Sequence, residues 1–474
     1  MIDHQTVNTF NAKGNYHLQE ASIPVQLTGT YKSYSDDPVE ICVWSEDRNA
    51  PEIFSNSMSY PFAIWFEGES DRGEDILMKG IRPFQFENFT HLNASVDVFI
   101  IGDLESRVKS GEELVTHSKV TSTPVIIPEW HYLRSFDGTI SVPGDKKERN
   151  GICWNNYQGK AQLIDDYEYI NGDKDNKEVT LRLQTNSLFL TINPNIEMDL
   201  KDVFLQLPKF LSEDLKLLSF IGRKRIAVTE ATTRTGTKNQ SSFTFARYRT
   251  WGGFYSQPSD ESFLRSVIWP RFLQQGLFEN LITNFRSSQY KQIIDRSISH
   301  LLTSYEDGYL ETHLVNAYAA LETMVDGIGE IYNQNFLLGN NQFKRLSKKI
   351  EETIRQEVRD ENTLQGIIKK LPELRRRRFL DRLLFLLNTQ GVNSKLIWPP
   401  NTDEPKEFHE ILKRRNDLIH QGVVSSINSS VLDLNRIQKL VELWILKLLE
   451  CPDDSINVHS LWHDAPINQI LHFE

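Results

Sequence analysis

The chain is organised around PKEFHEILKRRNDLIHQG, residues 405–422. Proline suits the first turn of a helix and glycine often follows the last turn, so this stretch predicts a helix over 405–421. Its apolar residues recur three, four and seven positions apart, which predicts one buried stripe. The stripe comprises Phe408, Ile411, Leu412, Leu418 and Ile419. Arg414 to Asp417 lie beside it, and His420 falls in the last turn.

An arginine and a histidine near one helix end suggest proton transfer next to a developing charge. Histidine can exchange protons near neutral pH, and arginine can bind phosphoryl oxygens through bidentate contacts. Asn416 precedes His420 by four residues, so its amide could orient the imidazole. Arg415 and His420 are roughly 140° apart around the helix axis. Two copies of this helix end, related by a two-fold axis, could combine these groups in one cleft.

This set of residues suits cleavage of RNA, whose 2′-hydroxyl supplies the nucleophile. We expect His420 to act as general acid or base and Arg415 to stabilise the phosphoryl charge, with Asn416 and Asp417 in support. The products would be a 2′,3′-cyclic phosphate and a 5′-hydroxyl. The alternative is that Arg415 and Asp417 are solvated helix residues and that His420 simply ends the helix, because such a pattern is common by chance.

The stretch Arg415-Asn416-Asp417-Leu418-Ile419-His420, followed by Gly422 and a second amphipathic helix, resembles the Arg-polar-x-x-x-His signature of HEPN ribonucleases. The whole chain is similar to the ApeA-like branch of that group, bacterial anti-phage proteins with a β-rich N-terminal region and a C-terminal HEPN domain. Residues 319–325, Ala-Ala-Leu-Glu-Thr-Met-Val, look like the earlier HEPN helix. The resemblance implies that Glu322 is the acidic residue near the active cleft.

The resemblance further implies a homodimeric, metal-independent, toxin-like endoribonuclease of an abortive-infection response, with tRNA as the leading substrate. The N-terminal domain would then restrain the nuclease and sense an invader, a phage-derived activator being one candidate ligand. The alternative is a non-catalytic HEPN-like module that dimerises or binds RNA or another partner. A weaker alternative is that the β-rich domain binds a carbohydrate or peptide through Trp130, His131 and Tyr132.

Composition limits the possible partners and compartments. The chain has 474 residues, and its net charge of −11 argues against a surface that binds nucleic acid everywhere, so RNA contact must be local. The three cysteines, Cys42, Cys153 and Cys451, lie far apart, which suits a reducing cytoplasm. No signal peptide, membrane span, phosphate loop or metal motif is recognisable, so we expect a cytoplasmic protein without a cofactor.

The pattern of apolar residues predicts an α+β protein with two domains. Residues 1–255 predict a β-rich, sandwich- or barrel-like domain, since short β-branched and aromatic runs recur between turn signals. Residues 256–474 predict an all-α, HEPN-like bundle. The predicted helices are 203–221, 259–274, 276–302, 306–328, 341–358, 361–388 with a break near Pro372, 405–421 and 430–449. The polar stretch 232–241 predicts a hairpin loop, either one that touches a ligand or phosphate backbone or a mobile surface loop.

Positive charge is concentrated in the helical half. Between Lys344 and Arg382 there are thirteen Lys and Arg residues against seven Asp and Glu residues, a local balance of +6. Arg375, Arg376, Arg377 and Arg378 are the densest part, and together with Lys413 and Arg414 they predict an RNA-binding surface beside the cleft. The alternative is a solvated face with salt bridges. Either His300 or His313 could also lie near the cleft through folding alone.

Overall fold

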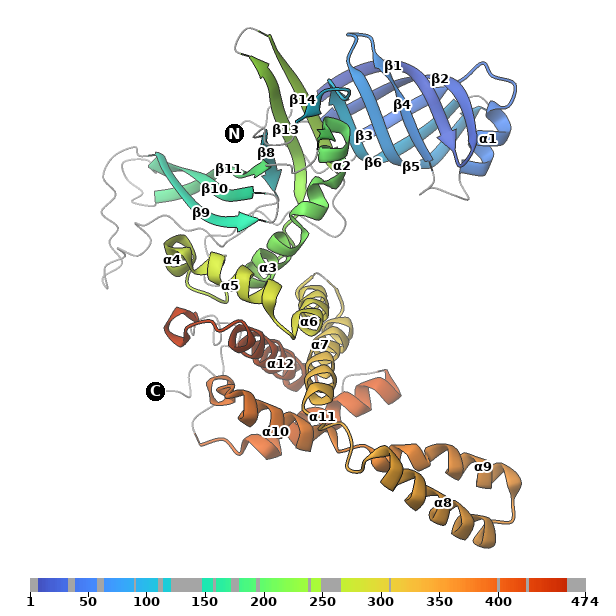
Figure 1. The fold of residues 1–474 in the computed structure, drawn as a ribbon, viewed down its shortest axis with the longest axis vertical. Helices are drawn as coiled ribbons and strands as arrows, with labels where there is room; N and C mark the ends of the chain where they lie inside the picture. The colour runs from blue at the N-terminus through green and yellow to red at the C-terminus, as the bar shows by residue number, and fades with distance from the viewer. Residues whose placement is uncertain are drawn as a thin grey trace. The chain divides into compact units, whose positions relative to one another are not determined.

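The computed structural model describes residues 7–32, 39–57, 64–88, 91–109, 114–120, 147–156, 159–171, 179–192, 197–237, 240–248, 266–306, 308–398, 401–422 and 426–457. Of these, the residues up to Tyr248 and Pro270–Glu279 form one compact unit, and those from 266 to 269 and from Asn280 onward form the other. The first is β-rich and the second helical (Figure 1), which confirms the predicted α+β class. The predicted domain boundary at 255/256 and the Trp130 to Tyr132 cluster lie outside the described residues.

Six antiparallel strands close into a barrel in the order β3-β2-β1-β4-β5-β6, and pairing of β6 with β3 completes the ring. Alternate residues point inward as the two-residue period of a strand requires, for example Val39, Ile41 and Val43 of β3. The strands are β1 Val7–Leu18, β2 Ala21–Lys32, β3 Val39–Trp44, β4 Ile64–Ser70, β5 Asp75–Asn88 and β6 His91–Gly102.

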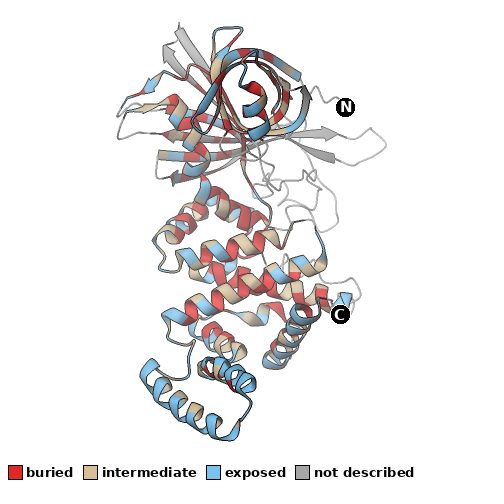
Figure 2. Cartoon of the chain, turned by 90° about the vertical axis from the view of Figure 1, so that its right-hand side faces the viewer, coloured by how far each residue is buried: buried red, intermediate tan, exposed pale blue. Residues whose placement is uncertain are grey.

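Helix α1, Ala50–Ser57, lies inside one end of this ring (Figure 2). Its fully buried Phe54 packs edge-on against the Tyr16 ring, with 5.4 Å between the ring centroids. The Tyr16 hydroxyl donates to Ser57 Oγ at 2.9 Å, and burial strongly raises the pKa of Tyr16. The helix therefore completes the barrel core.

A second run of strands continues from β6 in the order β14-β13-β8-β11-β10-β9. The predicted hairpin is confirmed, but its loop over 232–241 was predicted too long, because β13 extends to Thr237 and β14 starts at Gln240. The β-branched threonines of this stretch favour extended backbone, which outweighs their polarity. The strands are β8 Leu114–Val120, β9 Lys147–Asn156, β10 Gly159–Asn171, β11 Val179–Ile192, β13 Val228–Thr237 and β14 Gln240–Tyr248, and a separate pair joins β7 Arg107–Val108 to β12 Met198–Asp199.

Two short helices accompany these strands, α2 Leu200–Phe210 and α3 Ser212–Gly222. One continuous helix over 203–221 was predicted, whereas the structure divides it at Leu211. Pro208 lies in the last turn of α2 and cannot donate a backbone hydrogen bond, which weakens the helix at this point. A three-residue helix α4, Pro270–Phe272, leads into a π turn at Leu273–Leu277.

The helical unit packs α6 and α12 against α7, around fully buried residues such as Leu301, Met324 and Trp444. The predicted helices 306–328, 405–421 and 430–449 correspond to α7, α11 and α12, whereas the predicted 276–302 is two helices separated at Ser288–Tyr290. Residues 259–265 of another predicted helix lie outside the described residues. The helices are α5 Phe278–Ser287, α6 Lys291–Thr303, α7 Leu310–Ile331, α8 Asn340–Glu357, α9 Glu361–Lys370, α10 Phe379–Gln390, α11 Glu404–Gln421 and α12 Ile427–Leu448, with 3-10 turns at Leu371–Arg375, Ser394–Ile397 and Asp453–Ser455.

Helix α8 contains no buried residue, and most of α8 and α9 is coloured as exposed in Figure 2. The strongly basic stretch that begins at Lys344 therefore lies largely on exposed helix surface. Among the described residues, no helix is both long enough and apolar enough to span a bilayer.

Candidate active site on helix α11

The ends of α11 are fixed by the residues that predicted them. The Asp403 side chain accepts a hydrogen bond from the Lys406 backbone N–H at 3.3 Å, and Pro405 occupies the first turn. Gly422 ends the helix with a φ of 71°, a left-handed conformation that favours glycine, and its N–H donates to Leu418 O at 2.8 Å. These two caps determine which residues fall in the last turn and a half.

Arg415 is bound to the acidic residue of α7. Its Nη2 donates to Glu322 Oε1, and its Nη1 donates to Asn416 Oδ1 at 3.0 Å. The two charged side chains are partly exposed, 26% for Arg415 and 38% for Glu322. The structure therefore brings together Arg415, Asn416 and Glu322, and it leaves this guanidinium accessible to a ligand from solvent.

His420 does not take part in that cluster. It is exposed in the last turn of α11, and within the described part of the chain its imidazole has no hydrogen-bond partner. Asp417 is half-buried on the same helix. Since Arg415 and His420 diverge by roughly 140° around the helix axis, one copy of α11 does not direct both at the same atom.

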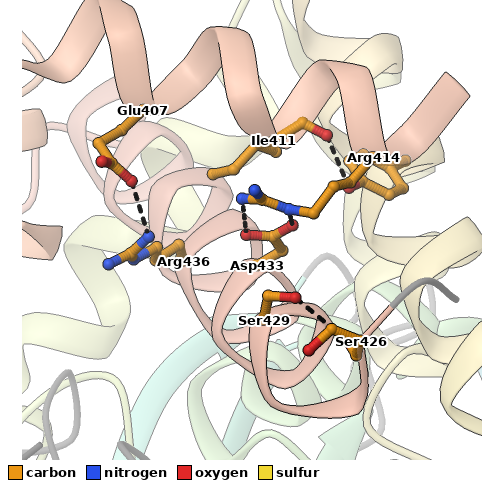
Figure 3. Close-up of polar contacts among 8 residues, drawn as sticks. Glu407, Ile411, Arg414, Ser426, Ser429, Asp433 and Arg436 are labelled. Carbon is orange, nitrogen blue, oxygen red and sulfur yellow. Dashed lines mark hydrogen bonds and ion pairs between the residues drawn. The ribbon is translucent and has the colours of Figure 1, made fainter. Parts of the chain in front are cut away.

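A buried ion pair beneath α11 fixes the residue before Arg415 (Figure 3). Arg414 Nε donates to Asp433 Oδ2 at 2.6 Å and Nη2 donates to Oδ1 at 2.8 Å, so two of its three guanidinium nitrogens bind Asp433 of α12. Asp433 is only 2% exposed. The hydrogen bonds that Arg414 donates to Asp433 raise the pKa of Arg414, and burial raises the pKa of Asp433. Arg414 was predicted to contact RNA, and the structure assigns two of its five N–H donors to this internal pair.

Two further contacts hold α11 in the same orientation. Arg436 of α12 donates from Nη1 to Glu407 Oε2 at 3.2 Å, as Figure 3 also shows. The Tyr318 hydroxyl of α7 donates to Ile411 O at 3.3 Å, and burial raises the pKa of this tyrosine. Because contacts of this kind connect α11 to both α7 and α12, the direction of the Arg415 side chain is well defined.

The four consecutive arginines have different environments. Arg375 donates to Leu338 O at 2.8 Å and to Asn340 Oδ1, and its guanidinium lies 4.0 Å from the centre of the Phe336 ring. Arg377 Nε donates to Phe336 O at 3.4 Å. The side chains of Arg376 and Arg378 are exposed and have no polar partner within the described ranges, and Lys413 is likewise exposed on α11. Only part of the predicted basic patch is therefore available to an anion.

A groove of about 1030 Å³ runs along α6 and α7 and includes Glu322 in its lining. Three carboxylates line it, and two of them are neutralised, since Glu322 binds Arg415 and Asp326 accepts from Arg382 Nη1 at 2.5 Å; the third is that of Glu330. Arg296, His300 and Arg376 also line it, and none of their side chains has a polar partner within the described ranges. The groove therefore presents cations that could bind phosphates.

Sequence analysis missed Arg296 and Lys291 as groove residues. Lys291 also lies over the Phe285 ring at 5.8 Å, a cation–π contact. The position of both residues depends on the antiparallel packing of α6 on α7, where Ser297 Oγ donates to Ala320 O at 3.3 Å. No feature local to residues 291–303 signals that contact.

The described residues contain no group of three or more His, Cys, Asp or Glu side chains arranged to hold a metal ion. Comparison of the chain with protein-family models, with curated proteins and with solved structures found no match in any of the three.

Proposed function

We propose that the chain is a metal-independent endoribonuclease whose active site is built on α11. One observation supports this proposal most strongly: Glu322 both binds the Arg415 guanidinium and lines the groove that presents unpaired cations. An RNA strand bound in that groove would place a phosphodiester beside Arg415. Because Arg415 and His420 diverge around the helix, a second copy of the helix end is required to complete the site.

The proposed reaction uses only groups of the protein and the substrate. The ribose 2′-oxygen attacks the adjacent phosphorus and gives its proton to a histidine acting as general base, while the bond from phosphorus to the 5′-oxygen breaks. The leaving 5′-oxygen takes a proton from a general acid, and the products are a 2′,3′-cyclic phosphate and a 5′-hydroxyl. Arg415 stabilises the charge on the phosphoryl oxygens, and Asn416 and Glu322 hold its guanidinium in place.

The biological part of the proposal rests on the resemblance to ApeA-like HEPN proteins. It comprises a homodimeric, cytoplasmic anti-phage nuclease that acts on tRNA and that its β-rich domain holds at a low but measurable activity until an activator binds. Restraint is expected because an unregulated ribonuclease harms the cell that makes it.

The test compares wild type, Arg415→Ala, His420→Ala and the control His409→Ala on total tRNA in EDTA. His409 is an exposed histidine of the same helix outside the cluster. We expect wild type and the control to cut, and the two site variants to lose activity by at least about 100-fold. The new 3′ ends should be 2′,3′-cyclic phosphates. Equal cleavage by all four proteins, or loss of wild-type cleavage in EDTA, would exclude the mechanism.

A second candidate is a non-catalytic module that dimerises or binds RNA or another partner. The observation that favours it is the exposed His420 imidazole, which no described residue orients. In this case RNA binding would survive in His420→Ala and the wild type would not cut RNA under any condition.

A further inference from the structure

A cavity of about 480 Å³ lies in the first unit, where the barrel meets the strands that continue from β6. Its walls come from β1 and β2, from the turn between β4 and β5, and from β6, β8, β13 and β14. Cavities of this size in proteins typically accept small ligands or single side chains. It lies within one compact unit and is independent of the proposed nuclease.

Aromatic rings form the apolar part of this cavity. Tyr31 and Phe245 stack with 5.5 Å between their centroids and 21° between their planes, and Phe10 lies 6.5 Å from Tyr31. Phe10 also stacks on the core residue Phe99 at 4.9 Å, which ties these rings to the barrel interior. Because the rings are held in place by one another, the cavity is preformed.

The charged residues of the lining are mostly acidic: Asp71, Glu74 and Glu230 against the single guanidinium of Arg72. The turn that carries Asp71 and Glu74 is ordered by hydrogen bonds from Gly73 N to Ser70 O at 3.0 Å and from Ser70 N to Glu74 O at 2.8 Å. Gly73 has a φ of 79°, which a residue with a side chain would adopt only under strain. The turn therefore fixes the backbone of Asp71 and Glu74, whose carboxylates form the acidic rim of the cavity.

A guanidinium outside the cavity lining is already held by a carboxylate and an aromatic ring of that lining. Arg247 Nη1 is 3.2 Å from Glu230 Oε1, with only 4% and 7% of the two side chains exposed, and the Arg247 guanidinium lies 5.9 Å from the centre of the Tyr31 ring. Burial is the main cause that raises the pKa of Tyr31, and the Glu230 carboxylate raises it further. The Tyr31 ring and Glu230 therefore already hold one cationic group, which shows that this side of the cavity lining suits a cation.

We propose that this cavity binds a guanidinium or ammonium group carried on a short apolar stem. The stem would pack against the aromatic rings, and the cationic group would pair with Glu74 and Asp71 at the rim. A phosphate or carboxylate ligand would instead meet the two rim carboxylates against the single guanidinium of Arg72, since Glu230 is paired with Arg247. Two sources of the cation are compatible with this chemistry, a free amine and an arginine or lysine side chain of a partner protein.

Calorimetric titration of the full chain tests the proposal. The probes are agmatine, a capped peptide with one arginine between glycines, and AMP as an anionic counter-probe. We expect a cationic probe to bind and AMP not to bind, with about 5-fold weaker binding in Glu74→Gln and in Tyr31→Leu. Glu20→Gln, which removes a carboxylate from the exposed turn between β1 and β2, should bind like wild type.

Tighter binding of agmatine would support a free amine, and tighter binding of the peptide would support a partner side chain. Circular dichroism of each variant shows whether it is folded, and Asp71→Asn gives a second rim variant if Tyr31→Leu does not fold. The proposal is overturned if neither cation binds at 10 mM, if AMP binds in this cavity, or if folded Glu74→Gln and Asp71→Asn both bind the cation as tightly as wild type.

Discussion

Arg414 and Asp433 form a bidentate ion pair between α11 and α12, with distances of 2.6 Å and 2.8 Å. Arg415 is the next residue after Arg414, and its guanidinium donates to Glu322 of α7 and not to Asp433. Two adjacent arginines therefore have different roles: the first fixes the helix and the second is presented at the surface.

We expect Asp433→Asn to lower the free energy of unfolding by about 1–3 kcal/mol, because the partly buried Arg414 guanidinium would lose its charged partner. Urea denaturation followed by circular dichroism measures this change. The matched control is Glu351→Gln, which breaks the exposed Arg355–Glu351 pair and should cost less than about 0.5 kcal/mol. Equal effects in the two variants would show that the internal pair does not stabilise the fold.

Glu322→Gln should reduce RNA cleavage about 10-fold, since the Arg415 guanidinium would no longer be held by a charged acceptor. Both side chains are partly exposed, so the change in stability should stay below about 1 kcal/mol. Single-turnover cleavage assays and thermal melts report the two effects. Glu311→Gln in the first turn of the same helix is the control, and faster cleavage by Glu322→Gln would mean that the carboxylate restrains Arg415 instead.

Arg296→Ala and Arg376→Ala should each weaken RNA binding and lower the slope of log K against log salt by about 1, because each removes one phosphate contact in the groove. Fluorescence anisotropy at several salt concentrations measures both quantities. Lys344→Ala removes an exposed cation from α8 that does not line the groove, so it should leave the slope unchanged. If only Lys344→Ala changes the slope, RNA binds the basic surface of α8 and not the groove.

The stability of the first unit should fall as the pH drops below about 6.5. Burial lowers the pKa of His17, with the nearby Glu67 opposing the shift, and the imidazole stacks on the Trp65 ring at 3.6 Å. The folded state then binds fewer protons than the unfolded state, so His17 favours folding at higher pH and this advantage is lost on acidification. An NMR titration of the His17 imidazole should give a midpoint below pH 6.5. His17→Gln should flatten the pH dependence of the melting temperature between pH 7 and 5. A midpoint above 6.5 would contradict the expectation.

Cysteine labelling should distinguish Cys153 from Cys451. Burial raises the pKa of the Cys451 thiol to about 11, whereas Cys153 is exposed on β9. With iodoacetamide at pH 8, mass spectrometry should find Cys153 labelled first and Cys451 labelled only after unfolding in urea, because the thiolate is the reactive form. Equal labelling rates in the folded protein would show that α12 and the segment after it are not packed as described.

Local sequence signals predicted the ends of α11, although Ile419 of its predicted buried stripe is exposed, and they predicted the hairpin of β13 and β14 with a loop that was too long. Proline near the start and Gly422 at the end act through backbone geometry alone, so they could be recognised without knowing the rest of the fold. The stretch from Thr232 to Thr237 looked like a loop because it is polar, yet hydrogen bonds from neighbouring strands hold it extended. The whole stretch pairs with β14, which follows it directly, and Thr232 and Thr233 also pair with β8, which lies far away in the sequence.

Only part of the candidate site could likewise be predicted from the sequence. The helix pattern places Arg415 and His420 at one end of α11, and the resemblance predicts that Glu322 lies near the cleft, where the structure sets it against Arg415. The Arg414–Asp433 pair and the groove residue Arg296 could not be predicted, since they arise only when α12 packs under α11 and α6 packs beside α7.

One edge of strand β6 pairs with two different strands. Residues His91 to Val96 pair with β3, and residues Val98 to Ile101 pair with β14, while β5 runs along the other edge. Neither neighbour can detach without loosening the strand that supports the other, so the barrel and the adjoining strands are expected to unfold as one cooperative block. The cation-binding cavity has walls on both sides of this junction, and it should keep its shape until that whole block melts.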